Sequence, residues 1–319
     1  MSRRSHQLAL FLAALISLTV SACDPRGLGL PNPDFLVIGH RGAPNIVAEN
    51  TISSFVVAAA LGANAIETDV CVTKDDQLVL WHDYDPDDAI AVARQSGAEG
   101  LGFIPLVPAV VSSWRRPVDE LTLSELREHY GYGNIWGQRD ETATIPTFNE
   151  ALDWMRSEPT LRAMYLDVKF PSGQTAAARA LVATVWNAWQ ADATLAHVRF
   201  YFLSVHRDIV DAMEAERVSL DAVTLRTVWD FEGLGALDAT LEAGLRDIST
   251  GLVPSVTWAR FKREVAELVN AREDGRIDSV TVWTFDREMH LTELLYYSVD
   301  GVMTNEPRAL YRIWQDALN

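Results

Sequence analysis

The chain has 319 residues, of which 48% are hydrophobic and 22% charged, enough for one sizeable core or two smaller domains. Its formal net charge of -17 and its isoelectric point of about 4.8 exclude general nucleic-acid binding, because an acidic surface repels phosphate backbones. Two cysteines are present, so the fold is not expected to depend on disulfide bonds.

The first segment of the chain is typical of an export signal. Arg3 and Arg4 precede an apolar run at 8–20, which is shorter than the about 20 residues of a membrane-spanning helix. Small residues then precede Cys23, as in a bacterial lipoprotein signal. We expect residues 1–22 to be removed, Cys23 to be lipidated, and the protein to be exported and anchored to a membrane, facing the periplasm or the cell exterior. The alternative is ordinary secretion with cleavage nearby.

Residues 23–34 are rich in Pro and Gly and predict a flexible tether, so residues 35–319 form the expected folded domain. Within that domain, eight short apolar segments are typical of strands: 35–39, 64–70, 78–82, 164–170, 198–204, 222–226, 279–285 and 300–304. Helical spacing of apolar residues occurs between several of them, at 51–62, 147–157, 174–190, 206–216, 259–273 and 288–298. A weaker segment at 246–250 is not counted as a strand.

Strands that alternate with helices indicate parallel β-α-β units. Eight such strands favour an α/β fold of the TIM (β/α)8 barrel type, with an open doubly wound sheet as the alternative. One connection is unusually long, because about 40 residues separate His82 from the helix that begins near Thr122. We therefore predict a long insertion after the third strand, at about 84–116. Its apolar segment 101–114 could line a pocket for an acyl chain, cover the site, or form a packed extra helix and loop.

Ionisable residues gather at the ends of the first four predicted strands. In a parallel barrel the carboxyl ends of all strands open onto one face, where sites are built. The residues are His40, Arg41, Glu67, Asp69, His82, Asp167 and Lys169. We expect them to meet at one mouth of the barrel.

Glu67 and Asp69 pose a question of charge, because residues two apart in a strand face the same way and two carboxylates there would repel each other. A cation between them removes the problem. Together with Asp167 they offer three hard oxygen ligands, which suit Mg²⁺ or Ca²⁺ better than zinc. We predict a divalent-cation site formed by these three residues.

The remaining residues of this group indicate phosphate chemistry. His40 and His82 are suited to proton transfer near neutral pH, and Arg41 and Lys169 can hold an anionic oxygen. A metal, two histidines and two cations together favour cleavage of a phosphate ester over hydrolysis of a peptide or glycoside. The sequence contains no GxSxG elbow and no Gly-rich P-loop.

The order of these motifs resembles that of the glycerophosphodiester phosphodiesterase family, a group of phospholipase C-like TIM barrels. The resemblance spans nearly all of residues 35–312 and rests on several blocks in sequence: GHRGAPNIVAENTISSF, GANAIETDV, LVLWHD, VDELTLSELREHY, IPTFNEALDWM, LDVKF, FLSVHRDIVDAM, VWTFDREMHLTELL and VDGVMTNEPRAL.

The resemblance implies an enzyme that uses a divalent cation to hydrolyse small glycerophosphodiesters to glycerol phosphate and an alcohol. It implies roles for eight residues: His40 and His82 as the acid/base pair, Glu67, Asp69 and Asp167 as metal ligands, Arg41 and Lys169 at the phosphate, and Glu49 near the metal or holding the first loop. Trp283 would wall the substrate pocket or belong to the core. The resemblance makes no prediction of oligomeric state.

One departure from the family pattern leaves a second enzyme class open. The fourth strand carries Asp167-Val-Lys169 where the family has Glu-x-Lys. Aspartate at this place also resembles sphingomyelinase D and phospholipase D relatives, whose substrates include lysolipids. A third hypothesis is a non-catalytic surface lipoprotein that binds a ligand. Loss of a histidine or carboxylate would be its expected sign, and both histidines and all three carboxylates are present.

Overall fold

The computed structural model describes residues 32–319. The expected signal segment, Cys23 and most of the tether lie outside the described residues. Within residues 32–319, no helix is both long enough and apolar enough to span a bilayer.

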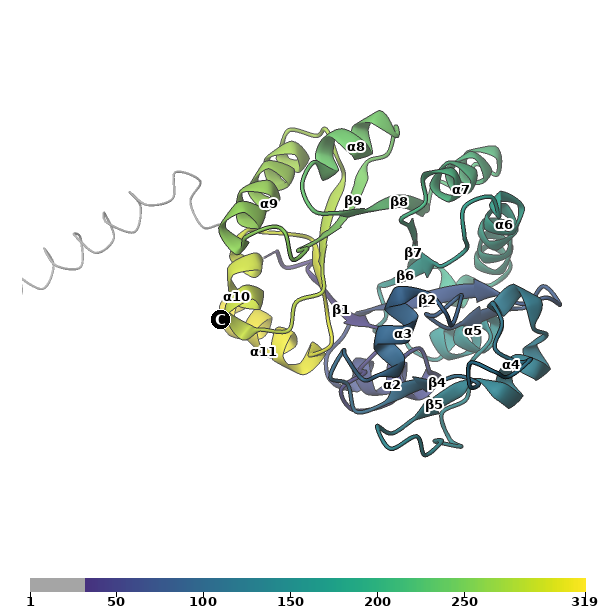
Figure 1. Cartoon of the computed structure of the whole chain (residues 1–319). Helices are drawn as coiled ribbons and strands as arrows, with labels where there is room; N and C mark the ends of the chain where they lie inside the picture. The colour runs from purple at the N-terminus through teal and green to yellow at the C-terminus, as the bar shows by residue number, and fades with distance from the viewer. Residues whose placement is uncertain (1–31) are drawn as a thin grey trace, which may run out of the picture.

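Eight parallel strands close into a barrel with helices around its outside (Figure 1). Strand β1 pairs with both β11 and β2, which closes the ring and excludes the open sheet. In chain order the barrel strands are β1 (Leu36–His40), β2 (Ala65–Val72), β6 (Ala163–Val168), β7 (Arg199–Ser204), β8 (Leu225–Glu232), β9 (Asp247–Gly251), β10 (Ser279–Trp283) and β11 (Gly301–Thr304). The predicted TIM barrel is confirmed.

Two strand assignments from the sequence were wrong, and a third was displaced, since the segment predicted at 222–226 overlaps β8 only at Leu225 and Arg226. The segment predicted as the third barrel strand forms β3 (Leu78–Leu80), which pairs antiparallel to β2 outside the ring. The segment left uncounted at 246–250 forms β9, which pairs with β8 and β10 and is fully buried. The long insertion therefore follows β3 in the chain but only the second strand of the barrel.

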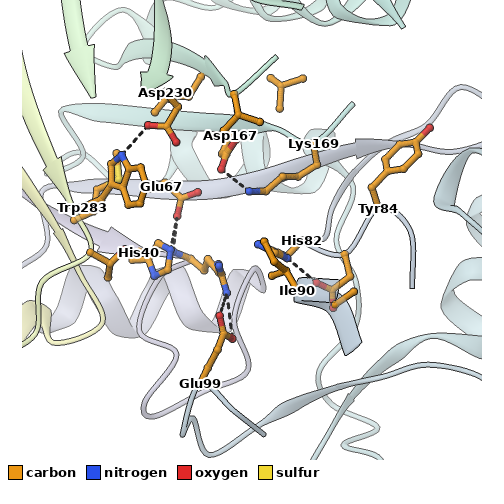
Figure 2. Close-up of a pocket in the computed structure, with 18 of the residues that line it drawn as sticks. His40, Glu67, His82, Tyr84, Ile90, Glu99, Asp167, Lys169, Asp230 and Trp283 are labelled. Carbon is orange, nitrogen blue, oxygen red and sulfur yellow. Dashed lines mark hydrogen bonds and ion pairs between the residues drawn. The ribbon is translucent and has the colours of Figure 1, made fainter. Parts of the chain in front are cut away.

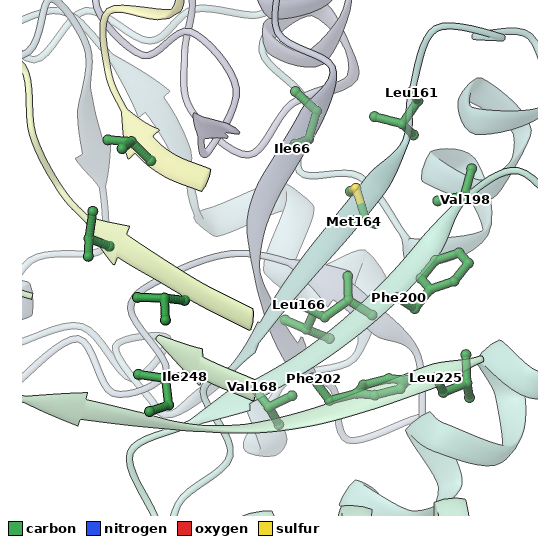
Figure 3. Close-up of a cluster of buried hydrophobic side chains, with 14 of the residues drawn as sticks. Ile66, Leu161, Met164, Leu166, Val168, Val198, Phe200, Phe202, Leu225 and Ile248 are labelled. Atoms are coloured by element: carbon green, nitrogen blue, oxygen red, sulfur yellow. The ribbon is translucent and has the colours of Figure 1, made fainter. Parts of the chain in front are cut away.

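Side chains alternate between the lumen and the outer face of the barrel along each strand. In β6, Tyr165 lies in the lumen and stacks on Tyr201 at a centroid distance of 4.4 Å. Its neighbours Met164 and Leu166 pack outward in the apolar layer beneath the helices (Figure 3). Asp167, two positions after Tyr165, therefore faces the mouth of the same lumen.

All six predicted helical segments are helical, and the longer helices bury an apolar stripe on the barrel. They are α2 (Ile52–Ala60), α5 (Phe148–Arg156), α6 (Thr175–Ala191), α7 (Arg207–Ser219), α9 (Trp258–Glu273) and α10 (Glu288–Tyr296). Helix α5 begins with a reciprocal capping box between Thr147 and Glu150. The sequence did not predict α8 (Ala236–Glu242) or α11 (Pro307–Leu318), nor the short 3-10 turn η2 (Ala193–Leu195).

The insertion between β3 and α5 folds as a small layer beside the mouth of the barrel (Figure 1). It contains α3 (Ala89–Gln95), β4 (Ile104–Leu106), the 3-10 turn η1 (Val118–Glu120), α4 (Leu123–His129) and β5 (Gly131–Gly133), with β4 and β5 paired antiparallel. Its aromatic side chains Tyr130 and Tyr132 pack on Trp81, at centroid distances of 6.3 Å and 5.0 Å. This core of its own holds the insertion against the segment after β3 that carries the second predicted histidine, His82.

Candidate active site

A cavity of about 820 Å³ opens at the carboxyl ends of the barrel strands (Figure 2). Six of the seven predicted strand-end residues line it, and the seventh, Asp69, lies buried behind them. The six are His40, Arg41, Glu67, His82, Asp167 and Lys169. Trp283 lines the cavity too, while the insertion contributes Ile90 and, from its apolar segment, Leu101.

His82 reaches this mouth by a route that the sequence did not predict. Because β3 runs antiparallel to β2, it leads the chain back from the carboxyl end of β2 to the level of Asp69, and the Trp81 amide donates to the Asp69 carbonyl at 3.2 Å. The next residue, His82, therefore lies near Asp69 and lines the same cavity as Glu67 and Asp167.

A tight turn after β1 places Arg41. Arg41 has a φ of 52° and Gly42 a φ of 92°, both in the left-handed region. The Arg41 amide donates to Glu67 Oε2 at 2.9 Å, so the turn also fixes the carboxylate of the neighbouring strand. A Cβ on Gly42 would meet Ser54 Oγ at 2.3 Å.

Replacing Gly42 by alanine is expected to destabilise the protein by more than about 1–2 kcal/mol, the cost of left-handed backbone at a residue with a side chain, because the contact with Ser54 adds to it. Urea denaturation of the variant measures the change. Gly100 is a matched control, since it also has a positive φ, 71°, but nothing lies within 4 Å of the added Cβ. Equal losses in the two variants would contradict the role assigned to the Ser54 contact.

Three carboxylates converge beneath the cavity. Ligand oxygens of Glu67, Asp69 and Asp167 all lie within 4.8 Å of one another. Asn50 orients Asp69, because its amide donates to Asp69 Oδ2 at 2.7 Å while its own oxygen accepts from the Asp69 amide at 3.1 Å. The residues fit a hard divalent cation, since all three donors are carboxylate oxygens held close together.

Two cationic side chains border this carboxylate cluster. Lys169 Nζ lies 2.5 Å from Asp167 Oδ2 and 3.1 Å from Asp69 Oδ1, and Arg41 Nε lies 3.1 Å from Asp69 Oδ2. Burial works against the charge of Lys169, but the Asp167 and Asp69 carboxylates prevail and raise its pKa. Both predicted phosphate-binding cations are therefore charged and adjacent to the predicted metal ligands.

The ring of His40 is held from its Nδ1 side. Nδ1 lies 2.8 Å from Asn305 Oδ1, and the Asn305 amide donates to Asp286 Oδ2 at 2.8 Å. Since Asn305 uses its NH₂ group on Asp286, its oxygen accepts the Nδ1 proton of His40. Burial, together with the Arg41 guanidinium, lowers the pKa of His40 to about 4. His40 is thus neutral at pH 7, with the lone pair on Nε2, which lies 3.9 Å from Glu67.

The ring of His82 is held in the same way by a charged group. Nδ1 donates to Asp83 Oδ1 at 2.6 Å, and Arg94 Nε donates to the same oxygen at 2.9 Å. Burial and the charges of Arg41 and Lys169 lower the pKa of His82. Burial raises the pKa of Asp83 to about 6, against the pull of Arg94.

The sequence predicted one further residue of the site, Glu49, but not Arg94 or Asp230. Glu49, expected near the metal or at the first loop, pairs with Arg41 at 2.8 Å and with Arg94 from the insertion. Asp230 in β8 lines the cavity and accepts from Trp283 Nε1 at 2.7 Å. Burial and the Asp167 carboxylate raise the pKa of Asp230 to about 7.

Comparison with known proteins identifies the family. The model of the glycerophosphoryl diester phosphodiesterase family matches residues 40–309. The chain belongs to this family. A glycerophosphodiester phosphodiesterase of Caldanaerobacter subterraneus subsp. tengcongensis is 35% identical over 292 residues, covering 87% of this chain and 97% of the relative.

Solved structures agree on the fold of this family member. A crystal structure from Silicibacter pomeroyi has a TM-score of 0.67 at 21% identity, covering 91% of this chain and 96% of that one. A phosphodiesterase from Oleispira antarctica, in complex with the product sn-glycerol-3-phosphate, has a TM-score of 0.63 at 18% identity, covering 91% and 97%. The predicted enzyme class, a phosphoric diester hydrolase, is confirmed by the family.

Proposed function

We propose that the enzyme hydrolyses glycerophosphodiesters to glycerol phosphate and an alcohol, by a divalent-cation-dependent reaction with His40 and His82 as the acid/base pair. One observation carries the proposal: two imidazoles, each fixed through Nδ1, face one cavity around a cluster of three carboxylates and two cations. The product bound to the Oleispira antarctica phosphodiesterase is of the same chemical class.

The groups behind the two imidazoles distinguish their roles. His40 has a neutral amide, Asn305, behind it and a free lone pair, which suits the removal of a proton from the nucleophile, either water or a neighbouring hydroxyl of glycerol. His82 has a carboxylate, Asp83, which stabilises an imidazolium. An anionic phosphate near Arg41 and Lys169 would offset the two charges that lower the pKa of His82.

The chemical step replaces one phosphorus–oxygen bond with another. The nucleophile's oxygen bonds to phosphorus as its proton passes to His40, and the bond from phosphorus to the leaving oxygen breaks as His82 gives that oxygen a proton. With water as the nucleophile this step yields glycerol phosphate directly. With the glycerol hydroxyl it yields a cyclic phosphate, which water opens to glycerol phosphate as His82 takes a proton from the water and His40 returns one to the hydroxyl. Glu67, Asp69 and Asp167 would hold the cation. A bound Mg²⁺ or Ca²⁺ supplies positive charge to phosphate oxygens as negative charge develops on them. Arg41 and Lys169 orient the same phosphate from the sides.

A substrate panel tests the proposal. Glycerophosphocholine, glycerophosphoethanolamine and glycerophosphoglycerol are compared with lysophosphatidylcholine and sphingomyelin, with and without Mg²⁺ or Ca²⁺, and products are followed by phosphorus NMR. Release of glycerol phosphate from the first group supports the proposal. Turnover of the lysolipid or sphingomyelin alone would establish the phospholipase D-like alternative that Asp167 leaves open, and binding without turnover would indicate a ligand-binding lipoprotein.

A substrate with a good leaving group tests the two histidine roles. A nitrophenyl ester of glycerol phosphate needs no proton on its departing oxygen. The variant that lacks the acid therefore recovers much of its activity on this ester, whereas the variant that lacks the base does not. We expect His82→Ala to recover and His40→Ala to stay impaired; the reverse pattern would exchange the two roles.

We also propose that the mature enzyme is a lipoprotein anchored through Cys23 and facing the periplasm or the cell exterior, because small residues and an apolar run precede this cysteine. Cys23→Ser is expected to move the enzyme from the membrane fraction to the soluble exported fraction or to leave it unprocessed, as seen by fractionation and mass spectrometry. Cys71→Ser is the control, since that thiol is buried in the fold. A Cys23→Ser variant that is still processed and membrane-bound would contradict the anchor.

A further inference from the structure

One cationic side chain of the insertion, that of Arg94, is fully buried next to the active site. Arg94 lies near the end of α3, and its side chain is only 2% exposed. Its three guanidinium nitrogens contact three different carboxylates. Nε donates to Asp83 Oδ1 at 2.9 Å, one terminal nitrogen donates to Glu99 Oε2 at 2.5 Å, and the other donates to Glu49 Oε1.

Two of these carboxylates are the ones that orient the reacting groups. Asp83 Oδ1, shared with Arg94, is the atom that holds His82 Nδ1 at 2.6 Å. Glu49 uses its second oxygen to hold Arg41 at 2.8 Å. Arg94 therefore links a histidine on one side of the cavity to a phosphate-binding cation on the other.

Charges alternate along this network. In order it runs from Asp69 through Arg41, Glu49, Arg94 and Asp83 to His82. From Asp69 to Asp83 each group pairs with a neighbour of opposite charge, and every member except His82 is at least nine-tenths buried. Glu99, at the rim, adds a second bridge between Arg41 and Arg94.

A guanidinium suits this place and an ammonium does not. Three donors spread over a rigid plane can reach three separate carboxylates at once, whereas the ammonium of lysine acts as a compact point charge. Without Arg94, Asp83 and Glu49 each lose a partner in a buried setting, and each is then free to move with the side chain that it holds.

We propose that Arg94 is a positioning residue that sets the orientation of both His82 and Arg41, so that the insertion is a part of the catalytic apparatus. This inference rests on the proposed function. It assigns to the insertion a task beyond covering the cavity, because a loop that only excluded water would need no buried charge aimed at these two carboxylates.

The test compares two insertion arginines in the full-length enzyme. Arg94→Lys keeps the charge but not the three-way contact. Arg115→Met is the matched control: the Arg115 side chain is also buried, 6% exposed, and it ties insertion segments together through Asp87, Gln95 and backbone carbonyls. Steady-state kinetics on glycerophosphocholine and thermal unfolding by circular dichroism are measured for both variants.

We expect Arg94→Lys to lower kcat on the order of 10²-fold, as for misplaced catalytic groups, and also to raise KM, because His82 and Arg41 are disturbed together. Arg115→Met is expected to lower the melting temperature while kcat and KM stay close to wild type. If Arg94→Lys keeps wild-type kcat and KM, or if Arg115→Met reproduces its kinetic losses, the inference is overturned.

A second measurement separates positioning from folding. In Asp83→Asn the carboxylate that links Arg94 to His82 is neutralised without loss of volume, so the variant retains the packing. If Arg94 acts through Asp83, adding Arg94→Lys to this variant lowers kcat by less than it does in the wild type. Full additivity overturns the link to His82. If the wild-type enzyme is inactive on every glycerophosphodiester, the proposed function is overturned, and this inference, which rests on it, is overturned too.

Discussion

Replacing His40 or His82 by alanine is expected to lower kcat on glycerophosphodiesters by about 10²–10⁴-fold, the usual contribution of an acid/base group. Each imidazole lines the cavity and has its Nδ1 atom committed, to Asn305 in one case and to Asp83 in the other. Only Nε2 is thus available for proton transfer, and alanine removes it without removing the groups that bind phosphate. Steady-state kinetics with purified variants measure the loss.

His290→Ala provides the control, since that imidazole stacks on Trp258 at 4.1 Å on the outer helical layer and does not line the cavity. Its kcat is expected to stay near the wild-type value. Near-full activity in either active-site variant, with an unchanged circular dichroism spectrum, would contradict the assignment of that histidine.

Removal of divalent cations by EDTA is expected to abolish activity, and Mg²⁺ or Ca²⁺ to restore it. Oxygens of three carboxylates lie within 4.8 Å of one another and repel each other. The side chains of Lys169 and Arg41 border this cluster, but the proposed reaction uses their charges to bind the phosphate. A divalent cation is therefore needed to neutralise the cluster. Calorimetric titration with each metal provides a readout besides activity. Undiminished turnover after exhaustive chelation would contradict the metal requirement.

Asp167→Asn provides a further check on the same cluster. The change removes one charged ligand and keeps the volume of the side chain, so the affinity for the metal is expected to fall while the fold is kept. The substitution Asp230→Asn is the matched control, because that carboxylate lines the cavity but is not part of the metal cluster. Equal metal affinity in Asp167→Asn and the wild type would remove Asp167 from the ligand set.

The sequence was informative where a single strand carried both the fold and the chemistry. In β2, the spacing of Glu67 and Asp69 predicted that they share a face, and their oxygens do converge. It was less informative for β9, whose lumen-facing positions are Asp247, Ser249 and Gly251, because polar and small residues there resemble a turn. Gly251 is required at its place, since a Cβ would meet the Trp283 ring at 2.4 Å.

Residues that reach the site from other segments could not be found in this way. Nothing near Arg94 in the sequence marks it as a partner of Glu49, because 45 positions separate them and the insertion decides their contact. Asn305 is different. It directly follows the last barrel strand, so the rule that led to His40 and Asp167 would have identified it.

The placement of β3 outside the ring has a consequence for how such an enzyme can diversify. Within the barrel, β2 forms its hydrogen bonds directly with β6, and these bonds do not involve the chain that lies between the two strands. The stretch from Tyr84 to Ile145 can therefore be exchanged, shortened or extended without any change in strand number or register. The entrance to the cavity can then change shape while the barrel stays the same. The one requirement is that the replacement segment supplies a partner for Glu49 and Asp83, as Arg94 does here.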